Sequence, residues 1–289
     1  MKIYLVPPSV DIVVDLADKF GAKPDVLLSY AFRGTFFSHF LRAHRHKIGH
    51  LMLDSGAYSH MEGTAKVDLD SYIAFLRSCA HLFDYCINLD TDPGDYDIRN
   101  WNLARIKGQG FSPLPVVHDP YAGEIDKLYD QGYRYILIGS SHGNDRKQLD
   151  FIFNRYFYSG RFPAIRFHKL GTTNYSTLAE YPFYSSDSAA FARIGGFGNV
   201  LFWNDQRDPD PNGDRTDMVY FGDRKCPTAE QGMDFRGYPS LGRLEDYLWR
   251  TFEYRLEDLV GSKGAEKRFF VNARYTLDLE ERITRLHGD

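Results

Sequence analysis

The chain is organised around one stretch, Leu51-Met52-Leu53-Asp54-Ser55-Gly56-Ala57-Tyr58, in which a short apolar run stops at a carboxylate. The run has the composition of a buried parallel strand. Small residues follow Asp54, so a ligand could approach the backbone closely before Tyr58 closes one side. The pattern predicts a strand that delivers Asp54 to a binding loop. Taken alone, it also fits an aspartate that only caps the following helix.

The same pattern of apolar run, polar turn and amphipathic stretch recurs along the first two thirds of the chain. The predicted strands are 3–6, 25–30, 51–53, 85–89, 114–117, 135–138, 164–167 and 183–186. The predicted helices between them are 12–20, 36–43, 68–83, 98–106, 124–131 and 150–158. Alternating strands and helices imply parallel pairing with right-handed crossovers. We therefore predict an α/β protein with a (β/α)8 barrel of the TIM type and a C-terminal helical extension.

The repeating pattern is lost near residue 195. Beyond it, 200–203 is predicted to be an extra strand, 241–259 a long helix laid over the outside of the barrel, and 277–286 another amphipathic helix. Residues 1–195 are accordingly assigned to the catalytic barrel core and residues 196–289 to an extension packed on it.

Composition narrows the class of protein. The chain has 289 residues, 43% of them hydrophobic, and it has no apolar run long enough to cross a membrane. We expect a cytoplasmic protein without membrane association. Its formal charge of -4 argues against indiscriminate binding of polyanions, and its three cysteines suggest neither a disulfide framework nor a metal site.

Cofactor motifs are missing from the sequence. It contains neither a P-loop nor an HExxH motif, and the run Gly195-Gly196-Phe197-Gly198 lacks dinucleotide-binding spacing. We therefore expect no cofactor and no metal. An unrelated barrel hydrolase that binds zinc through His118, His142 and His168 is kept as an alternative.

Polar residues follow most of the predicted strands, at Asp54, Asp90, His118, Asp119, Gly139, His168 and Asp187. In barrels of this type the chemistry gathers at the carboxyl ends of the strands. These residues are thus predicted to share one end of the barrel, and the set is too concentrated to consist of caps alone.

A second polar cluster is basic and includes Arg42, Arg45 and Lys47, with two histidines between them. It has two interpretations. The residues could form the solvated end of a helix, or they could contact the phosphates of a nucleic acid.

Two motifs resemble one enzyme family. Asp54-Ser55-Gly56-Ala57-Tyr58-Ser59 is similar to the D-S-G-G-[FY]-Q turn of the queuine tRNA-ribosyltransferases, or tRNA-guanine transglycosylases. Tyr181-Pro182-Phe183-Tyr184-Ser185-Ser186-Asp187-Ser188 resembles the Y-P-[WF]-Y-S-x-D-S segment of shorter relatives, the deazapurine DNA modification transglycosylases of phages and bacterial islands. The two motifs occur in the family's order, and the resemblance extends over residues 25–190.

The resemblance implies a role for individual residues. Asp187 would be the nucleophile and Asp54 the general acid and base, while Asp90 would read the Watson–Crick edge of the base. Further substrate contacts would come from the backbone of Gly139, from Tyr58 and Leu170 on the two faces of the base, and from the neighbouring Gly171 and His118. The tRNA enzymes commonly have glutamine at the position of His118.

The family's pattern also points to partners. The tRNA enzymes carry a C-x-C-x-x-C…H zinc subdomain after the nucleophile, whereas only Cys226 follows Asp187 here. This difference favours DNA over tRNA as the polymer, with a free 7-deazaguanine base as the second substrate. A non-catalytic nucleic-acid-binding paralogue remains an alternative, and whether the chain forms a homodimer is left open.

Overall fold

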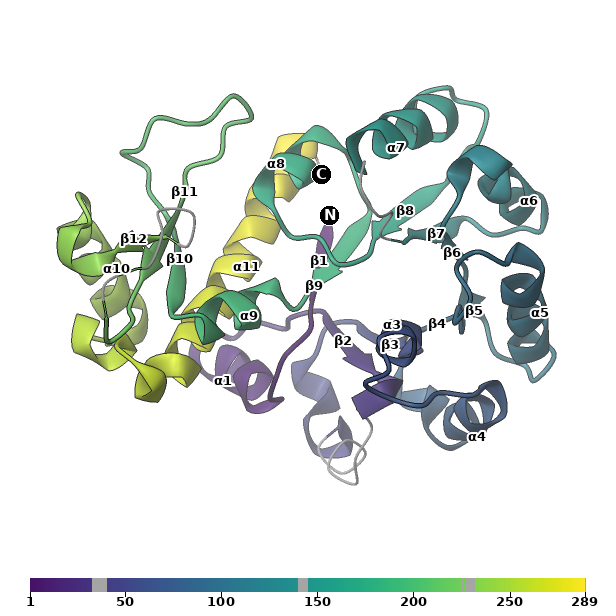
Figure 1. Cartoon of the computed structure of the whole chain (residues 1–289), viewed down its shortest axis with the longest axis horizontal. Coiled ribbons are helices and arrows are strands. Elements are labelled where there is room, and N and C mark those ends of the chain that lie inside the picture. The colour runs from purple at the N-terminus through teal and green to yellow at the C-terminus, as the bar shows by residue number, and fades with distance from the viewer. Residues whose placement is uncertain (33–40, 140–144, 225, 227–231, 289) are drawn as a thin grey trace.

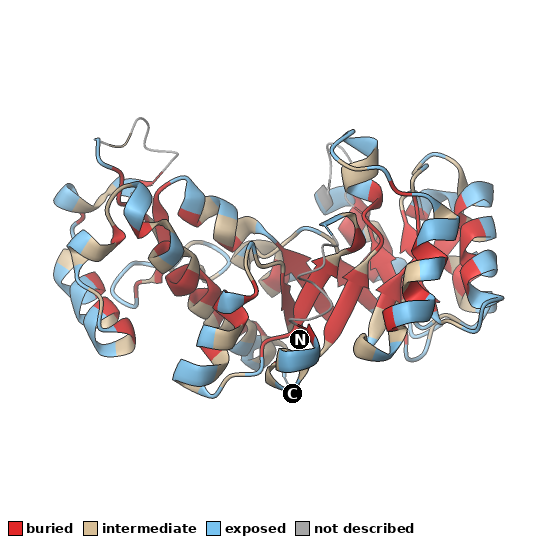
Figure 2. Ribbon diagram, turned by 90° about the horizontal axis from the view of Figure 1, so that it is seen from below, coloured by how far each residue is buried: buried red, intermediate tan, exposed pale blue. Residues whose placement is uncertain are grey.

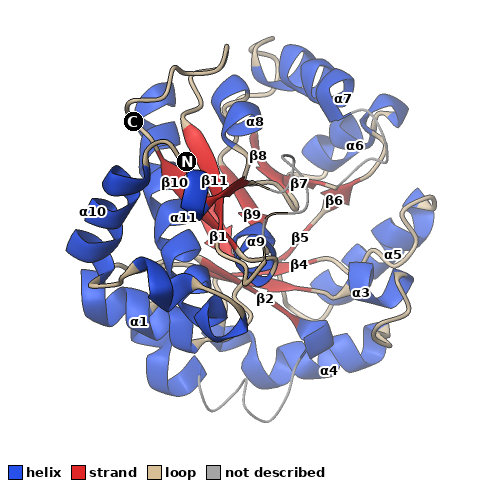
Figure 3. Ribbon diagram, turned by 60° about the vertical axis from the view of Figure 1, so that its left-hand side comes forward, coloured by secondary structure: helices blue, strands red, loops and turns tan. Residues whose placement is uncertain are grey.

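The computed structural model describes residues 1–32, 41–139, 145–224, 226 and 232–288, and it contains one large parallel sheet. The sheet has nine strands in the order β5-β4-β3-β2-β1-β9-β8-β7-β6. Their bounds are β1 Lys2–Leu5, β2 Val26–Ser29, β3 Leu51–Asp54, β4 Tyr85–Ile87, β5 Pro113–Leu114, β6 Val116–Val117, β7 Tyr135–Ile138, β8 Arg166–Lys169 and β9 Ser185–Ser188. Figure 3 shows these strands at the centre of a ring of helices.

The sheet closes on itself through a strand that proline interrupts. β5 pairs with β4 and β6 pairs with β7, and only Pro115 separates β5 from β6. Proline has no N–H to donate to a ladder. Its carbonyl oxygen still accepts the Leu137 N–H at 2.9 Å, while the Leu114 carbonyl accepts the Asn88 N–H at 2.9 Å. β5 and β6 are therefore two halves of one strand, and the predicted (β/α)8 barrel is confirmed.

Helices cover the outside of this barrel (Figure 1). They are α1 Asp11–Phe20, α3 Ala57–Met61, α4 Leu69–Cys79, α5 Tyr96–Lys107, α6 Glu124–Asp130, α7 Asp145–Ile152, α8 Tyr175–Glu180 and α9 Ala190–Gly196. Asp68 caps the start of α4, because its carboxylate accepts the Ser71 N–H at 2.9 Å. α7 continues into a π-helical turn, Phe153–Phe157. Most of the helix predicted over 36–43 lies outside the described residues.

Apolar side chains fill both the barrel and the layer around it. The interior cluster consists of Tyr4, Leu27, Met52, Ile87, Leu114, Val116 and Leu137. Figure 2 shows the strands as the most deeply buried part of the molecule, beneath helices whose outer faces are exposed. Because the interior is packed, polar side chains can form a site only above this layer, at an end of the barrel.

The extension contains a second, smaller sheet. β10 (Asn199–Trp203) pairs antiparallel with β11 (Thr216–Tyr220), which pairs with β12 (Met233–Asp234). Two helices accompany it, α10 (Leu241–Phe252) and α11 (Ala265–His287). α11 runs back to the barrel (Figure 1), where the Glu280 carboxylate accepts the Ile3 N–H at 2.5 Å. The helical extension is confirmed, and its last helix lies against the first barrel strand.

The boundaries of four predicted elements were wrong. The helix predicted over 241–259 ends at Phe252, because Glu253 adopts a left-handed conformation (φ 63°) that stops it, and a separate 3-10 turn, Leu256–Leu259, follows. The last helix begins at Ala265 instead of residue 277. The seventh and eighth strands lie two residues further along the chain than predicted, so His168 and Asp187 are strand residues.

One finding concerns membranes. Within the described ranges, no helix combines the length and the apolar character that a membrane crossing requires.

Candidate active site

Three carboxylates meet at the carboxyl ends of the barrel strands. Asp54 ends β3, Asp187 lies in β9, and Asp90 follows β4. Burial, together with the negative charges of Asp90 and Asp187, raises the pKa of Asp54 to about 6, against hydrogen bonds from Ser29 and the Gly56 N–H that lower it. A carboxylate raises the pKa of another only when the two lie within electrostatic reach of each other. The three aspartates thus share one site.

Asp54 is not the N-cap of the following helix. The N-cap of α3 is Gly56, which has no side chain and adopts a left-handed conformation (φ 80°). Its N–H donates to Asp54 Oδ2 at 3.0 Å. A side chain at this glycine would collide with Ala31, whose Cβ would lie 2.7 Å away. Gly56 therefore lets the turn pack tightly and directs its own N–H at the Asp54 carboxylate.

Asp187 is held by one of its two oxygens. Its Oδ1 lies 3.0 Å from His168 Nε2 and accepts the Gly171 N–H at 3.2 Å. Among the residues that the structure describes, Oδ2 has no hydrogen-bond partner. The carboxylate is consequently fixed in orientation while one oxygen stays available to a ligand.

A buried chain of hydrogen bonds supports His168 from below. Its Nδ1 lies 2.8 Å from the Ser185 hydroxyl, which lies 2.6 Å from the Tyr135 hydroxyl. A neutral imidazole has one donor and one acceptor nitrogen. If Tyr135 donates to Ser185 and Ser185 donates to Nδ1, then Nε2 carries the proton and donates it to Asp187. In that arrangement, the chain of hydrogen bonds selects the tautomer that holds the Asp187 carboxylate.

Asp90 pairs with the histidine at the end of β6. Its Oδ2 lies 2.7 Å from His118 Nε2, and both residues are largely buried. The His118 N–H donates to Glu124 at 3.2 Å, and Glu124 forms a buried ion pair with Arg99. The other side of the imidazole packs on Gly139, where an added Cβ would lie 2.7 Å from Nδ1. Gly139 therefore makes room for the His118–Asp90 pair.

Replacing Gly139 by alanine is expected to lower kcat/KM for the base exchange that the sequence predicts about 10- to 100-fold, because displacing His118 misplaces Asp90 by an appreciable fraction of an ångström. The test measures exchange at several base concentrations. Gly94→Ala is the matched control, since this glycine follows β4 at the same end of the barrel and its added Cβ would only reach ordinary contact, 3.5 Å from Asp92. Equal kcat/KM for the two variants would contradict the role of Gly139.

Two predicted base contacts differ in exposure. Tyr58, in α3, is 65% exposed, whereas Leu170, after β8, is half-buried against the interior cluster. Tyr58 is therefore open to solvent, whereas Leu170 packs on the apolar layer beneath the carboxyl ends of the strands. Their contact with the two faces of one base stays a prediction.

Sequence reasoning missed the groups beneath the site. Lys169 is buried and donates from Nζ to the Gly139 carbonyl oxygen at 3.3 Å, while Ser185 and Tyr135 orient His168. Hydrophobic periodicity cannot reveal a buried lysine or serine, because their burial depends on partners from other strands. Their one sequence signal is position, because Lys169 follows one predicted strand and Tyr135 and Ser185 belong to two others.

The structure does not bring the basic cluster to the three aspartates. Arg42 is exposed, and Arg45 and Lys47 precede β3, so they lie toward the amino ends of the strands. Arg45 pairs with Asp84 at 2.6 Å and Lys47 pairs with Asp18 at 2.5 Å. The charges of these two residues are thus engaged by carboxylates of the chain itself.

Within the described ranges, no group of three His, Cys, Asp or Glu side chains is arranged so that it could hold a metal ion. His142, which the zinc alternative required, lies outside the described residues.

Comparisons with known proteins add two structural resemblances. No protein-family model matches the chain, and no curated protein matches it. A solved structure described as 4-hydroxy-2-oxoglutarate aldolase/2-deydro-3-deoxyphosphogluconate aldolase from TTHB1 has a TM-score of 0.41 and 14% identity, covering 65% of this chain and 82% of its own. A racemase from Streptomyces coelicolor A3(2) with bound magnesium has a TM-score of 0.40 and 16% identity, covering 65% and 58% respectively. The chain therefore spans less than two thirds of the racemase, and neither resemblance bears on function.

Proposed function

We propose that this chain is an enzyme, a transglycosylase that exchanges guanine in a nucleic acid for a 7-deazaguanine such as 7-cyano-7-deazaguanine. One observation supports this proposal most strongly. Asp54, Asp90 and Asp187 share one end of the barrel, and the pKa of Asp54 is raised to about 6 by burial and by the other two carboxylates. Base exchange at a sugar carbon requires carboxylates in such unlike states.

The first half of the reaction breaks the bond between the sugar and guanine. The free Oδ2 of Asp187 attacks C1′, so that a C1′–O bond forms while the C1′–N9 bond breaks. The departing guanine takes the proton of Asp54, which is the acid that its raised pKa suits. The products of this half are a covalent glycosyl-aspartate and a free base.

The second half reverses these steps with another base. Asp54, now ionised, accepts the N9 proton of the 7-deazaguanine, and the base attacks C1′ and releases Asp187. In this proposal Asp90, which His118 holds, accepts hydrogen bonds from the Watson–Crick edge of the purine. No net hydrolysis occurs, so the polymer keeps its length and changes one base.

The polymer in this proposal is DNA in preference to tRNA. The chain has only Cys226 after Asp187 and so lacks the cysteines of the tRNA enzymes' zinc subdomain. In either polymer the target nucleotide must leave its stack before C1′ can reach Asp187. The exposed ring of Tyr58 is available to hold it.

The deciding experiment offers the protein each polymer separately. DNA and tRNA are incubated with labelled guanine or labelled 7-cyano-7-deazaguanine, and label in the precipitated polymer is counted. Label in DNA is the expected result, whereas label in tRNA alone would assign the tRNA activity. Binding of either polymer without label would identify a non-catalytic nucleic-acid-binding protein. A protein that shows no binding and no label with either polymer would contradict the proposal.

A further inference from the structure

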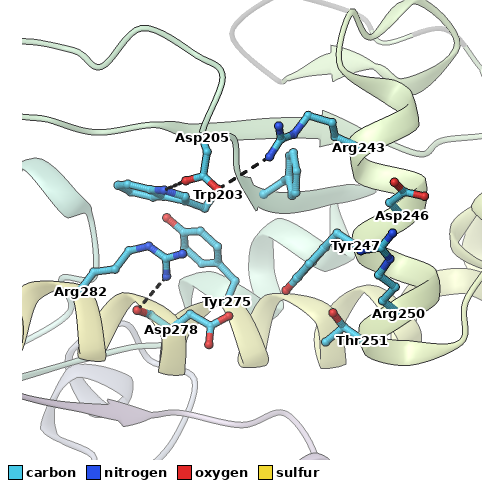
Figure 4. Close-up of a pocket in the computed structure, with 11 residues that line it drawn as sticks. Trp203, Asp205, Arg243, Asp246, Tyr247, Arg250, Thr251, Tyr275, Asp278 and Arg282 are labelled. Carbon is cyan, nitrogen blue, oxygen red and sulfur yellow. Dashed lines mark hydrogen bonds and ion pairs between the residues drawn. The ribbon is translucent and has the colours of Figure 1, made fainter.

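A cavity of about 500 Å³ lies in the C-terminal extension, outside the barrel. Its walls come from the end of β10, from one side of α10 and from the second half of α11 (Figure 4). The site at the strand ends does not use any of its residues. We call it the extension cavity, and it is lined by Phe202, Trp203, Asp205, Arg243, Asp246, Tyr247, Arg250, Thr251, Tyr275, Asp278 and Arg282.

Aromatic rings form much of its wall. Trp203, Tyr247 and Tyr275 project from three different elements toward the same space (Figure 4). Trp203 is fixed in place, because its indole N–H donates to Asp205 at 2.9 Å and the Tyr175 ring packs against it with the centroids 5.3 Å apart. The Arg282 guanidinium lies 4.6 Å from the centre of the same indole. The cavity thus offers flat, pre-positioned surfaces of the kind on which a heterocycle stacks.

The lining carries three arginines and three aspartates, and two of the aspartates have an arginine within ion-pair distance. Arg243 lies 3.8 Å from Asp205, and Asp278 pairs with Arg274 at 2.5 Å, outside the lining. Of the remaining lining charges, Arg250 and Arg282 are positive and Asp246 is negative. Arg250 and Arg282 therefore supply positive charge on two different helices, near which one anionic group of a ligand could lie.

We propose that the extension cavity binds one unpaired nucleotide of the polynucleotide strand, with its base against the aromatic wall and its phosphodiester near Arg250 and Arg282. A phosphodiester carries a single negative charge, and every base has a flat face. This inference rests on the proposed function, because it gives the substrate strand a second point of contact. It also specifies that the strand is unpaired at that point, since a base cannot enter a cavity while it remains in a duplex.

A short segment of chain links the cavity wall to the site at the strand ends. Tyr175, which packs on Trp203, begins α8, and Gly171, whose N–H holds Asp187, lies four residues earlier. Four residues span at most about 14 Å. One strand could consequently place its target nucleotide at Asp187 and a flanking nucleotide in the extension cavity.

Tryptophan fluorescence tests the proposal directly. The chain has three tryptophans, so a protein with Trp101→Phe and Trp249→Phe reports on Trp203 alone. We titrate it with single-stranded oligothymidylate, with oligouridylate and with thymidine monophosphate. The expected result is quenching by an oligonucleotide at concentrations at least about 10-fold lower than those at which the mononucleotide quenches.

Charge variants locate the phosphate contact. In the same background, Arg250→Gln with Arg282→Gln is expected to weaken oligonucleotide binding about 10-fold or more, which corresponds to the loss of two charge-assisted contacts. Arg285→Gln is the matched control, because Arg285 belongs to the same helix as Arg282 but is largely exposed and pairs with Glu281. Thermal unfolding of all variants shows whether the fold is preserved.

The outcomes separate this inference from the proposed function. An Asp187→Asn variant that no longer exchanges bases but still shows oligonucleotide quenching supports the cavity independently of catalysis. A wild-type protein that never exchanges bases but shows the quenching would contradict the proposed function only. Absence of quenching, equal binding by the Arg250/Arg282 and Arg285 variants, or equally strong quenching by the mononucleotide would overturn the inference.

Discussion

Replacing Asp187 by asparagine is expected to lower the rate of base exchange by at least about 10³-fold, because an amide oxygen does not attack an anomeric carbon to form a glycosyl ester. The substitution changes little else. An asparagine oxygen can still accept from the Gly171 N–H and from His168, which hold Oδ1 in the wild-type chain. The measurement is single-turnover incorporation of labelled base, together with a denaturing gel that detects a protein–nucleic acid adduct.

Asp119→Asn is the matched control for this experiment. Asp119 also lies at the carboxyl end of the barrel, but its carboxylate accepts the N–H groups of Tyr121 and Ala122 and caps a short 3-10 turn, Pro120–Ala122. Asparagine serves equally well in such a cap. Exchange and adduct formation should therefore persist in Asp119→Asn, and an Asp187→Asn variant with the same activity as this control would remove the basis for a covalent intermediate.

The sequence was sufficient to predict the barrel because most strands are continuous apolar runs. The run at 51–53 and the run at 135–138 agree with β3 and β7 to within a residue. Once the strands are known to be parallel, Asp54, Asp90 and Asp187 must lie at the same end. The sequence therefore placed the three aspartates at that end, although it could not give the rise in the pKa of Asp54 that burial, and then the other two carboxylates, cause.

Strands that carry buried polar residues were harder to place. β8 ends in His168 and Lys169, and β9 consists of Ser185, Ser186, Asp187 and Ser188, all of them buried. Each of these strands was predicted two residues early, where the apolar residues are. A polar side chain is stable inside a protein when a partner from elsewhere in the chain satisfies it, as Ser185 satisfies His168. Such partners cannot be recognised from hydrophobicity along one segment.

Charge pairing explains why the basic cluster could not be interpreted from the sequence. The partner of Lys47 is Asp18, which precedes the cluster in the sequence, and the partner of Arg45 is Asp84, which follows it. Conversely, the arginines of the extension cavity are scattered over α10 and α11 and form no run. Charged residues that are neighbours in the sequence therefore did not indicate which charged residues lie together in the structure.

Replacing Asp54 by asparagine is expected to abolish exchange while it stabilises the fold above neutral pH. The loss of a general acid and base lowers the rate typically 10²- to 10⁴-fold. Stability changes in the opposite direction. The folded state raises the pKa of Asp54 from 3.8 to about 6, so it binds this proton more tightly than the unfolded chain does. The wild-type stability associated with Asp54 is therefore complete below pH 3.8 and is lost as the pH rises to about 6.

The size of this effect follows from the shift, which corresponds to about 3 kcal/mol at most. Asparagine resembles the neutral carboxyl and can still accept the Gly56 N–H. We expect Asp54→Asn to exceed the wild type in free energy of unfolding by about 1–3 kcal/mol at pH 8 and by little at pH 4. Urea unfolding at the two pH values measures the difference. An aspartate that only supports the fold would give the reverse result, a variant less stable than the wild type at pH 8. A variant that is more stable yet inactive is therefore expected only if burial destabilises the ionised Asp54 carboxylate and catalysis requires that carboxylate.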